Sequence, residues 1–349
     1  MALPPHVNSS TKVTNAFAVY NAVGNREDLS NAIYNIDPFD TPVMSATRRR
    51  NVKNRWFDWQ TEFLPLVDGN NAQPEGFLLN PNQATPTIRQ QGVAQISERD
   101  ATVSGSQESA DAAGKSSEMA HQMAMSSKVL KSDMELIMCS RQARVDETSG
   151  NAPTARKTES ITHWIGRYAD RNGNAANVGT ATQTSGGATV GVVGLPATSG
   201  LPALNTDAMT APGTPVQLTE QMLGDAMQKA YQNGASPSLW ILPPGPKRTA
   251  STFTGRSTTQ VLVGKTEVVA TVDVFATDFG RVKVIPSRWV PVDVGLLIDP
   301  DYIAVAFYRS FRQYLMARTG DAENRMIVVE WGVEMRNAGA NVLFNGITK

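Results

Sequence analysis

The amino-acid sequence predicts an α+β fold, on three observations. An alternating stretch around Phe57 predicts a long β-hairpin, and residues 115–149, which hold neither glycine nor proline, predict one long helix. From residue 238 onwards the chain is rich in short strands that do not alternate regularly with helices, which is typical of α+β rather than α/β proteins. With 349 residues, 41% of them hydrophobic, the chain can bury a core in one elaborated fold or two domains.

The first fifty residues predict an extended arm with one short helix. Residues 1–25 are polar and lack periodicity. Leu29, Ile33 and Ile36 are spaced for one helical face, so a helix is expected over 26–36. Asp37-Pro38 ends it, because the residue before a proline is disfavoured in the helical region.

The predicted hairpin runs from Val52 to Val103. In its first strand, Val52 to Leu64, aromatic residues alternate with polar ones; its second, Thr87 to Val103, is mostly polar, and the tip spans about twenty residues. A ribbon with so little apolar surface is marginal alone in water. Two interpretations stay open: an ordinary surface hairpin on the chain's own core, or an arm laid over a neighbouring subunit that shelters it.

Residues 115–149 predict a helix of about thirty residues, which would be ~45 Å long. Apolar residues recur along it at spacings near three, four and seven: Met119, Met123, Leu130, Met134, Ile137 and Val145. We interpret this methionine-rich stripe as core or interface packing rather than as part of a cofactor site.

A polar segment separates this helix from the strand-rich region. From residue 169 to 215 glycine, alanine, threonine, asparagine and proline dominate, so a loop insertion or a segment ordered by a partner is expected. A helix over 218–232, a buried strand over 238–242 and a short helix to Phe253 follow. The remaining strands are predicted at 266–277, 281–285, 296–298, 302–308 and 326–335.

Charge and motifs argue against an enzyme. Thirty-two basic residues balance thirty-two acidic ones, which is unlike an autonomous DNA-binding protein, and a net charge near zero promotes association. Val263–Thr266 resembles the end of a phosphate-binding loop but lacks the required glycine, and Asp278-Phe279-Gly280 is interpreted as a tight hairpin turn. We therefore expect no catalytic residue, no cofactor and no metal.

Cysteine, histidine and hydrophobic patterning exclude further classes. The single Cys139 rules out an intramolecular disulfide and is expected to be a small packed hydrophobe. The three histidines lie far apart and form no ligand pattern. No run approaches the ~20 apolar residues that span a bilayer, so no membrane partner is expected.

One dense basic cluster, residues 48–55, precedes the tryptophans of the hairpin. It can be interpreted as a nucleic-acid contact in which the indole rings stack on bases, or as a solvated or interface-pairing cluster. We expect contacts between subunits from the following residues of the cluster and hairpin: Arg48, Arg49, Arg50, Arg55, Trp56, Trp59, Phe63 and Phe77.

Two sequence motifs are the most distinctive of the chain: Asn31-Ala-Ile-Tyr-Asn-Ile-Asp-Pro-Phe-Asp-Thr-Pro-Val-Met44 and Phe57-Asp-Trp-Gln-Thr61. In these motifs, and in its predicted order of arm, hairpin, long helix and α+β remainder, the chain resembles the tailed-bacteriophage major capsid proteins of the Hong Kong 97 type. The resemblance implies an N-terminal arm (1–50), an E-loop hairpin (51–104), a P-domain with a spine helix (105–165), an A-domain with the polar insertion (166–275), and strands completing both domains (276–349).

The resemblance also implies the biology. Such proteins form hexamers and pentamers of an icosahedral virion shell, made in the bacterial cytoplasm, around double-stranded DNA that is held without sequence specificity. The expected partners are further copies of the chain, a portal protein and a separate scaffolding protein, since the fifty residues before the hairpin are too few for a scaffold domain. The resemblance also allows a decoration or cement protein. The alternatives are an encapsulin-like compartment or an enzyme without a short motif.

One departure from some relatives concerns covalent fastening. Some shells are joined by an isopeptide bond from an E-loop lysine, but no lysine lies between Lys53 and Lys115 here. A non-covalent shell is therefore expected.

Overall fold

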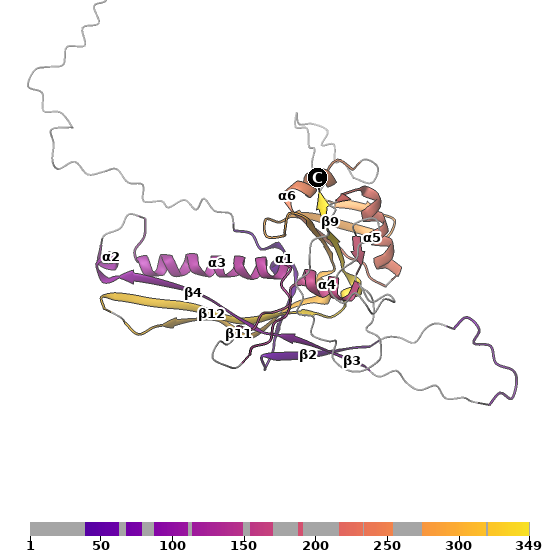
Figure 1. Ribbon diagram of the computed structural model, residues 1–349, viewed down its shortest axis with the longest axis horizontal. Helices are drawn as coiled ribbons and strands as arrows, with labels where there is room; N and C mark the ends of the chain where they lie inside the picture. The colour runs from indigo at the N-terminus through magenta and orange to yellow at the C-terminus, as the bar shows by residue number, and fades with distance from the viewer. Residues whose placement is uncertain are drawn as a thin grey trace, which may run out of the picture.

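The computed structural model describes residues 39–62, 68–78, 87–110, 114–148, 154–169, 188–190, 216–232, 234–253, 274–318 and 320–348. Within them the chain forms a four-stranded sheet with a long helix along it, a six-stranded sheet flanked by shorter helices, and a projecting hairpin (Figure 1). The helix expected over 26–36, Phe63, and most of the polar segment 169–215 lie outside the described residues.

The four-stranded sheet gathers distant parts of the chain. Its order is β1 (Arg48–Asn51), β11 (Ile303–Leu315), β12 (Ala322–Met335) and β4 (Gln95–Ser104), with β1 parallel to β11 and the other pairs antiparallel. β11 and β12 are longer than predicted. The outer half of β11 is largely exposed and therefore lacks the apolar alternation from which a strand is predicted.

The long helix α3 (Glu118–Cys139) packs along β4 and β12 (Figure 1). Ser117 caps it, accepting a hydrogen bond from the Ala120 N–H at 3.1 Å. The predicted stripe faces the core, since Met119, Met123, Leu130 and Met134 are buried.

The prediction that this helix continues to residue 149 was wrong. α3 ends at Cys139, where Ser140 turns the backbone to an extended conformation. Beyond it Arg141 donates to Asp293 and Asn345, and Val145 pairs with Lys157 in an isolated bridge. These tertiary contacts outweigh the helical propensity of the segment.

The predicted hairpin exists, but only in part. β2 (Trp56–Thr61) pairs antiparallel with β3 (Ile88–Val93), from Trp56 opposite Val93 to Thr61 opposite Ile88. The predicted second strand breaks at Ala94, and the residues after it form β4, which pairs with β12 instead. A ribbon extending to Val103 was therefore wrong, because half of that strand belongs to the chain's own four-stranded sheet.

The six-stranded sheet has the order β5 (Ala188–Val190), β13 (Val342–Asn345), β10 (Val294–Ile298), β7 (Leu239–Leu242), β9 (Gly280–Pro286) and β8 (Val274–Thr277). The predicted helices are confirmed as α5 (Glu220–Gln232) and α6 (Pro244–Ala250). β8 and β9 form a hairpin whose turn is Asp278-Phe279, as predicted, with Gly280 at φ +148°. The remaining elements are α1 (Pro42–Ala46), α2 (Gly105–Ser109), α4 (Ile161–Ala169), β6 (Val216–Gln217), β14 (Ile347–Thr348) and two 3₁₀ turns (Pro300–Tyr302 and Ala338–Ala340).

The core consists of two apolar clusters, one on each side of β7. Leu239 and Ile241 face a cluster that includes Trp331 and Trp164, whereas Trp240 and Leu242 face a second cluster under α5 and α6. Because both faces of β7 are buried, its sequence is continuously apolar rather than alternating.

Candidate assembly interface

The base of the hairpin is part of the chain's own core. Phe57 and Trp59 are 4% and 8% exposed. The ring of Trp59 lies 5.5 Å from that of Trp164, centroid to centroid. Two expectations are corrected by this burial: Trp59 lies in the core rather than on a surface that a neighbour reaches, and the base of the ribbon does not depend on an adjacent copy for shelter.

Two glycines make room for the Phe57 ring. A Cβ on Gly92 would lie 2.5 Å from the ring, and a Cβ on Gly332 of β12 would lie 2.8 Å from the ring and 2.7 Å from the Val93 carbonyl oxygen. The hairpin therefore approaches β12 more closely than any side chain at position 332 would permit.

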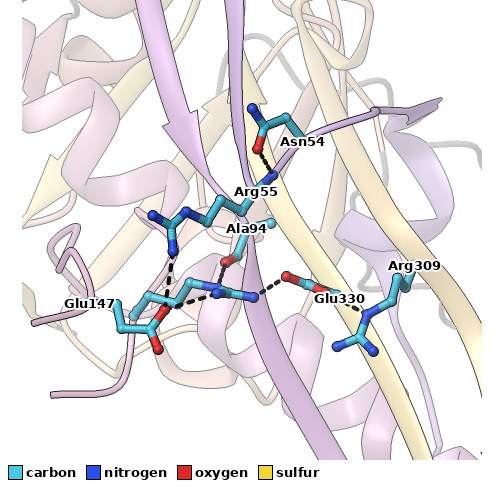
Figure 2. A network of polar contacts seen from close by, with 7 residues as sticks. Asn54, Arg55, Ala94, Glu147, Arg309 and Glu330 are labelled. Atoms are coloured by element: carbon cyan, nitrogen blue, oxygen red, sulfur yellow. Dashed lines mark hydrogen bonds and ion pairs between the residues drawn. The ribbon is translucent and has the colours of Figure 1, made fainter. Parts of the chain in front are cut away.

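A network of arginines and carboxylates fastens the same junction (Figure 2). Arg156 donates to the Ala94 carbonyl oxygen at 2.7 Å, to Glu147 at 3.0 Å, and to Glu330. Arg309 of β11 donates to the other oxygen of Glu330 at 2.6 Å, and the Glu330 side chain is only 2% exposed. This buried carboxylate thus connects β11 and β12 to the break between β3 and β4.

Residues 141–148, which follow α3, also hold β3 and the start of β4 in place. Arg144 donates to the backbone and side-chain oxygens of Gln91 at 3.1 and 2.9 Å. Gln142 donates to the side-chain oxygen of Gln95 at 2.9 Å, which also accepts the Thr158 N–H at 3.1 Å. These bonds explain why residues 141–148 leave the helix, since their side chains are needed at the hairpin base.

The tip of the hairpin is exposed, whereas the base is buried. Residues 68–78 lie at the far end of the hairpin, away from the sheets (Figure 1). Phe77 and Leu78 are 53% and 93% exposed. The Phe77 N–H donates to the Pro74 carbonyl oxygen at 3.1 Å, with Gly76 at φ +80° completing the turn. Two large apolar side chains on one turn form a surface suited to another protein.

The basic cluster is mostly paired within the chain. Arg48 lies 2.7 Å from Asp301, Arg50 lies 2.6 Å from Glu334, and Arg55 lies 3.6 Å from Glu147. The Arg55 guanidinium also covers the exposed Trp56 ring at 4.2 Å. These contacts argue against phosphate binding by the paired arginines, and they lie within the chain, whereas the second interpretation expected a solvated cluster or pairing across an interface.

Sequence reasoning missed Glu135, which attaches α1 to α3. Its buried carboxylate accepts the N–H groups of Val43 and Met44 at 2.7 and 2.8 Å. Pro42 has no N–H, so these are the first free donors of α1. The pKa of Glu135 is raised to about 7, chiefly by burial and to a smaller extent by the nearby Asp40, whereas the hydrogen bonds from the Met44 and Val43 N–H groups oppose the rise.

This pKa predicts a pH-dependent stability. Because the folded chain retains the Glu135 proton up to about pH 7 and the unfolded chain releases it near 4.5, the free energy of unfolding falls as pH rises through this window, by about 3 kcal/mol. Urea unfolding of Glu135→Gln should lack this component of the decline, whereas Glu98→Gln, on the exposed face of β4, should retain it. An identical pH slope in wild type and Glu135→Gln would contradict the assignment.

Features of other functional classes are absent from the described residues. There, no group of three histidine, cysteine, aspartate or glutamate side chains lies close enough to hold a metal ion. Searched over the same part of the chain, no helix is long and apolar enough to cross a membrane. Cys139 is fully buried, and burial raises the pKa of its thiol, as suits the predicted packed hydrophobe.

Three charged residues that hold α1 and the hairpin base within the subunit were not predicted: Glu135, Arg156 and Glu330. For Glu135 and Glu330 the sequence did carry a signal, an acidic residue inside an apolar pattern. Glu330 interrupts the apolar run Val328-Val329-Glu330-Trp331, and Glu135 follows Met134 within the methionine stripe. An acid within an apolar pattern is either exposed or held by buried donors, and the structure shows the second case for both.

Comparison with known proteins finds a matching family, a curated relative and solved structures of similar fold. Residues 11–348 match the family described as SU10 major capsid protein. The major capsid protein of Escherichia phage Phieco32 is 26% identical over 347 residues, covering 95% of this chain and 97% of that protein. Among solved structures, the mature capsid of bacteriophage PhiM1 aligns with a TM-score of 0.56 at 8% identity, covering 99% of this chain and 98% of that one. The Cyanophage A-1(L) capsid aligns at 0.56 and 10% identity, covering 95% and 99%.

Proposed function

Since the chain belongs to the SU10 major capsid protein family and has the Hong Kong 97-type fold, it is a structural protein of a phage capsid, and we propose that it builds its shell from hexamers and pentamers. The family is structural and not enzymatic. The encapsulin-like alternative is less supported, since both the family and the Phieco32 relative are phage capsid proteins.

The observation that carries the proposal is the contrast within the hairpin. Its base is buried among Phe57, Trp59 and Trp164, whereas Phe77 and Leu78 at its tip are exposed on a turn. A projecting arm with a fixed base and an apolar end is suited to reach a neighbouring subunit. Many such contacts repeated around a closed shell add through multivalency, although each is modest.

The remaining partners follow from the family resemblance. We expect a portal protein and a separate scaffolding protein, with assembly in the cytoplasm of the bacterial host, and the resemblance also allows a decoration protein. Packaged double-stranded DNA is held without sequence specificity. The zero net charge and the intramolecular pairing of Arg48, Arg50 and Arg55 support an enclosing wall rather than a strong DNA-binding surface.

Negative-stain electron microscopy of the full chain, expressed with and without its scaffolding protein, tests this function. Closed shells with hexameric and pentameric clusters are expected. If the chain instead gives only small oligomers under both conditions, the proposal fails.

A second prediction concerns covalent fastening. Because no lysine lies between Lys53 and Lys115, the tip of the hairpin offers no amine for an isopeptide bond with a neighbour. Intact particles boiled in denaturant should run as a single band at 37.6 kDa on a reducing gel. A ladder of higher species under these conditions would refute it.

A further inference from the structure

A cavity of about 490 Å³ opens where α1, β1, β11 and α3 meet. Three phenylalanines, Phe39, Phe307 and Phe311, give it an aromatic part, and the rest of the lining includes two basic side chains, Arg49 and Lys131, together with Met44 and small polar residues. A volume of this size falls in the range of roughly 300–1,000 Å³ that binding pockets typically have. The cavity is built to receive a group that is both apolar and negatively charged.

The two cations are available for such a group. On β1, Arg48 and Arg50 are paired with Asp301 and Glu334, whereas Arg49 lies on the alternate face of the strand and lines the cavity. The Lys131 ammonium lies 6.0 Å from the Phe311 ring centroid. Among the described residues neither Arg49 nor Lys131 has an ion-pair partner, no acid lines the cavity, and both side chains are exposed.

The complementary chemistry is present at the hairpin tip. Residues 68–78 carry two acids, Asp68 and Glu75, and no basic residue. Neither acid has an ion-pair partner among the described residues, and Glu75 stands two positions before the exposed Phe77. The turn at Pro74–Phe77 therefore presents one carboxylate and two apolar side chains together.

We propose that the turn Pro74–Leu78 of a second copy docks in this cavity, with Phe77 against the aromatic wall and Glu75 paired with Arg49 and Lys131. The inference rests on the proposed function and specifies one of its contacts. The donor is a second copy because Phe57 and Trp59 fix the hairpin base in the core, and the tip projects away from α1 and α3 of its own chain (Figure 1). The aromatic contact excludes water, and the ion pairs set the register of the turn.

Disulfide trapping in assembled particles tests the docking directly. Leu78→Cys, which keeps Phe77 in place, combined with Ser310→Cys on the cavity wall should give a ladder of disulfide-linked multimers after oxidation, which reductant abolishes. The native Cys139 is buried and does not contribute. In the control, Leu78→Cys is combined with Val292→Cys, which is 82% exposed on the loop before β10, and should stay monomeric on the gel.

Charge reversal tests the ion pairs. Arg49→Glu and Glu75→Arg should each raise the concentration needed for half-assembly about tenfold, and the double variant should recover most of the loss. Lys53→Glu, an exposed residue that does not line the cavity, should behave as wild type.

The outcomes separate the two proposals. If wild-type shells form but the Leu78–Ser310 cysteine pair gives no ladder, the docking inference is overturned while the capsid function stands. The same holds if Arg49→Glu alters only DNA retention and Glu75→Arg does not rescue it, which would assign the cavity to nucleic acid. If the wild type forms no shell, the proposed function itself fails.

Discussion

Glu330→Ala is expected to lower the free energy of unfolding of the isolated subunit by about 1.5–3 kcal/mol, because it removes the charge-assisted hydrogen bonds from Arg156 and Arg309, while Arg156 keeps Glu147 as a partner. The Glu330 carboxylate is shared by Arg156 and Arg309 and is 2% exposed. Arg156 also donates to the Ala94 carbonyl oxygen at the break between β3 and β4. The substitution should therefore loosen the backbone around this break as well as lower the stability of the whole subunit. Urea unfolding, with hydrogen exchange of residues 88–104, measures both effects.

The matched control lies on the same strand. Glu323 of β12 pairs with Arg325, but the two side chains are 23% and 39% exposed. Glu323→Ala should therefore cost under about 1 kcal/mol, as partly exposed pairs do. Equal losses for the two variants would mean that Glu330 does not fasten the hairpin.

Phe57→Ala is expected to cost about 3–5 kcal/mol, since it removes a buried aromatic side chain and leaves a cavity. The void would lie between Gly92 and Gly332, which have no side chains to fill it. Trp56→Ala, one position earlier but 41% exposed and stacked on Arg55, should cost at most about 1 kcal/mol.

Gly332→Val tests the contact between the Phe57 ring and the sheet from the side of β12. Its side chain would meet the Val93 carbonyl and the Phe57 ring, so the hairpin base must shift. We expect a loss of about 1–3 kcal/mol by urea unfolding, together with faster exchange of β2 and β3 amides. Wild-type exchange at β2 in this variant would contradict the close packing of hairpin and sheet.

Local patterns in the sequence predicted most elements but few of their partners. The alternation around Phe57 and Trp59 predicted β2, and the methionine stripe predicted α3. The polar strand after Thr87 carried no signal for its division, because its second half pairs with β12, more than two hundred residues later. A period of two shows which residues share a face, not which strand lies beside them.

The predicted site residues show the same difference between local pattern and tertiary contact. Phe77 was predicted at an interface as one of the hairpin residues, and it is exposed in the subunit. Trp59 was predicted to contact a neighbour, and it is buried because Trp164, on α4, reaches it through the fold. The end of α3 was misplaced because Arg141 and Arg144 are held by Asp293 and Gln91, which are distant in sequence.

The account implies a hairpin held in two different ways: its base by its own subunit, and its tip by a second copy in the shell. Hydrogen exchange on dilute monomers and on assembled particles measures both parts at once. Amides of Trp56–Thr61 and of residues 89–93 should be protected in both states, whereas residues 68–78 should exchange rapidly in monomers and slowly in shells. Rapid exchange of the base in monomers, or a tip equally protected in both states, would contradict it.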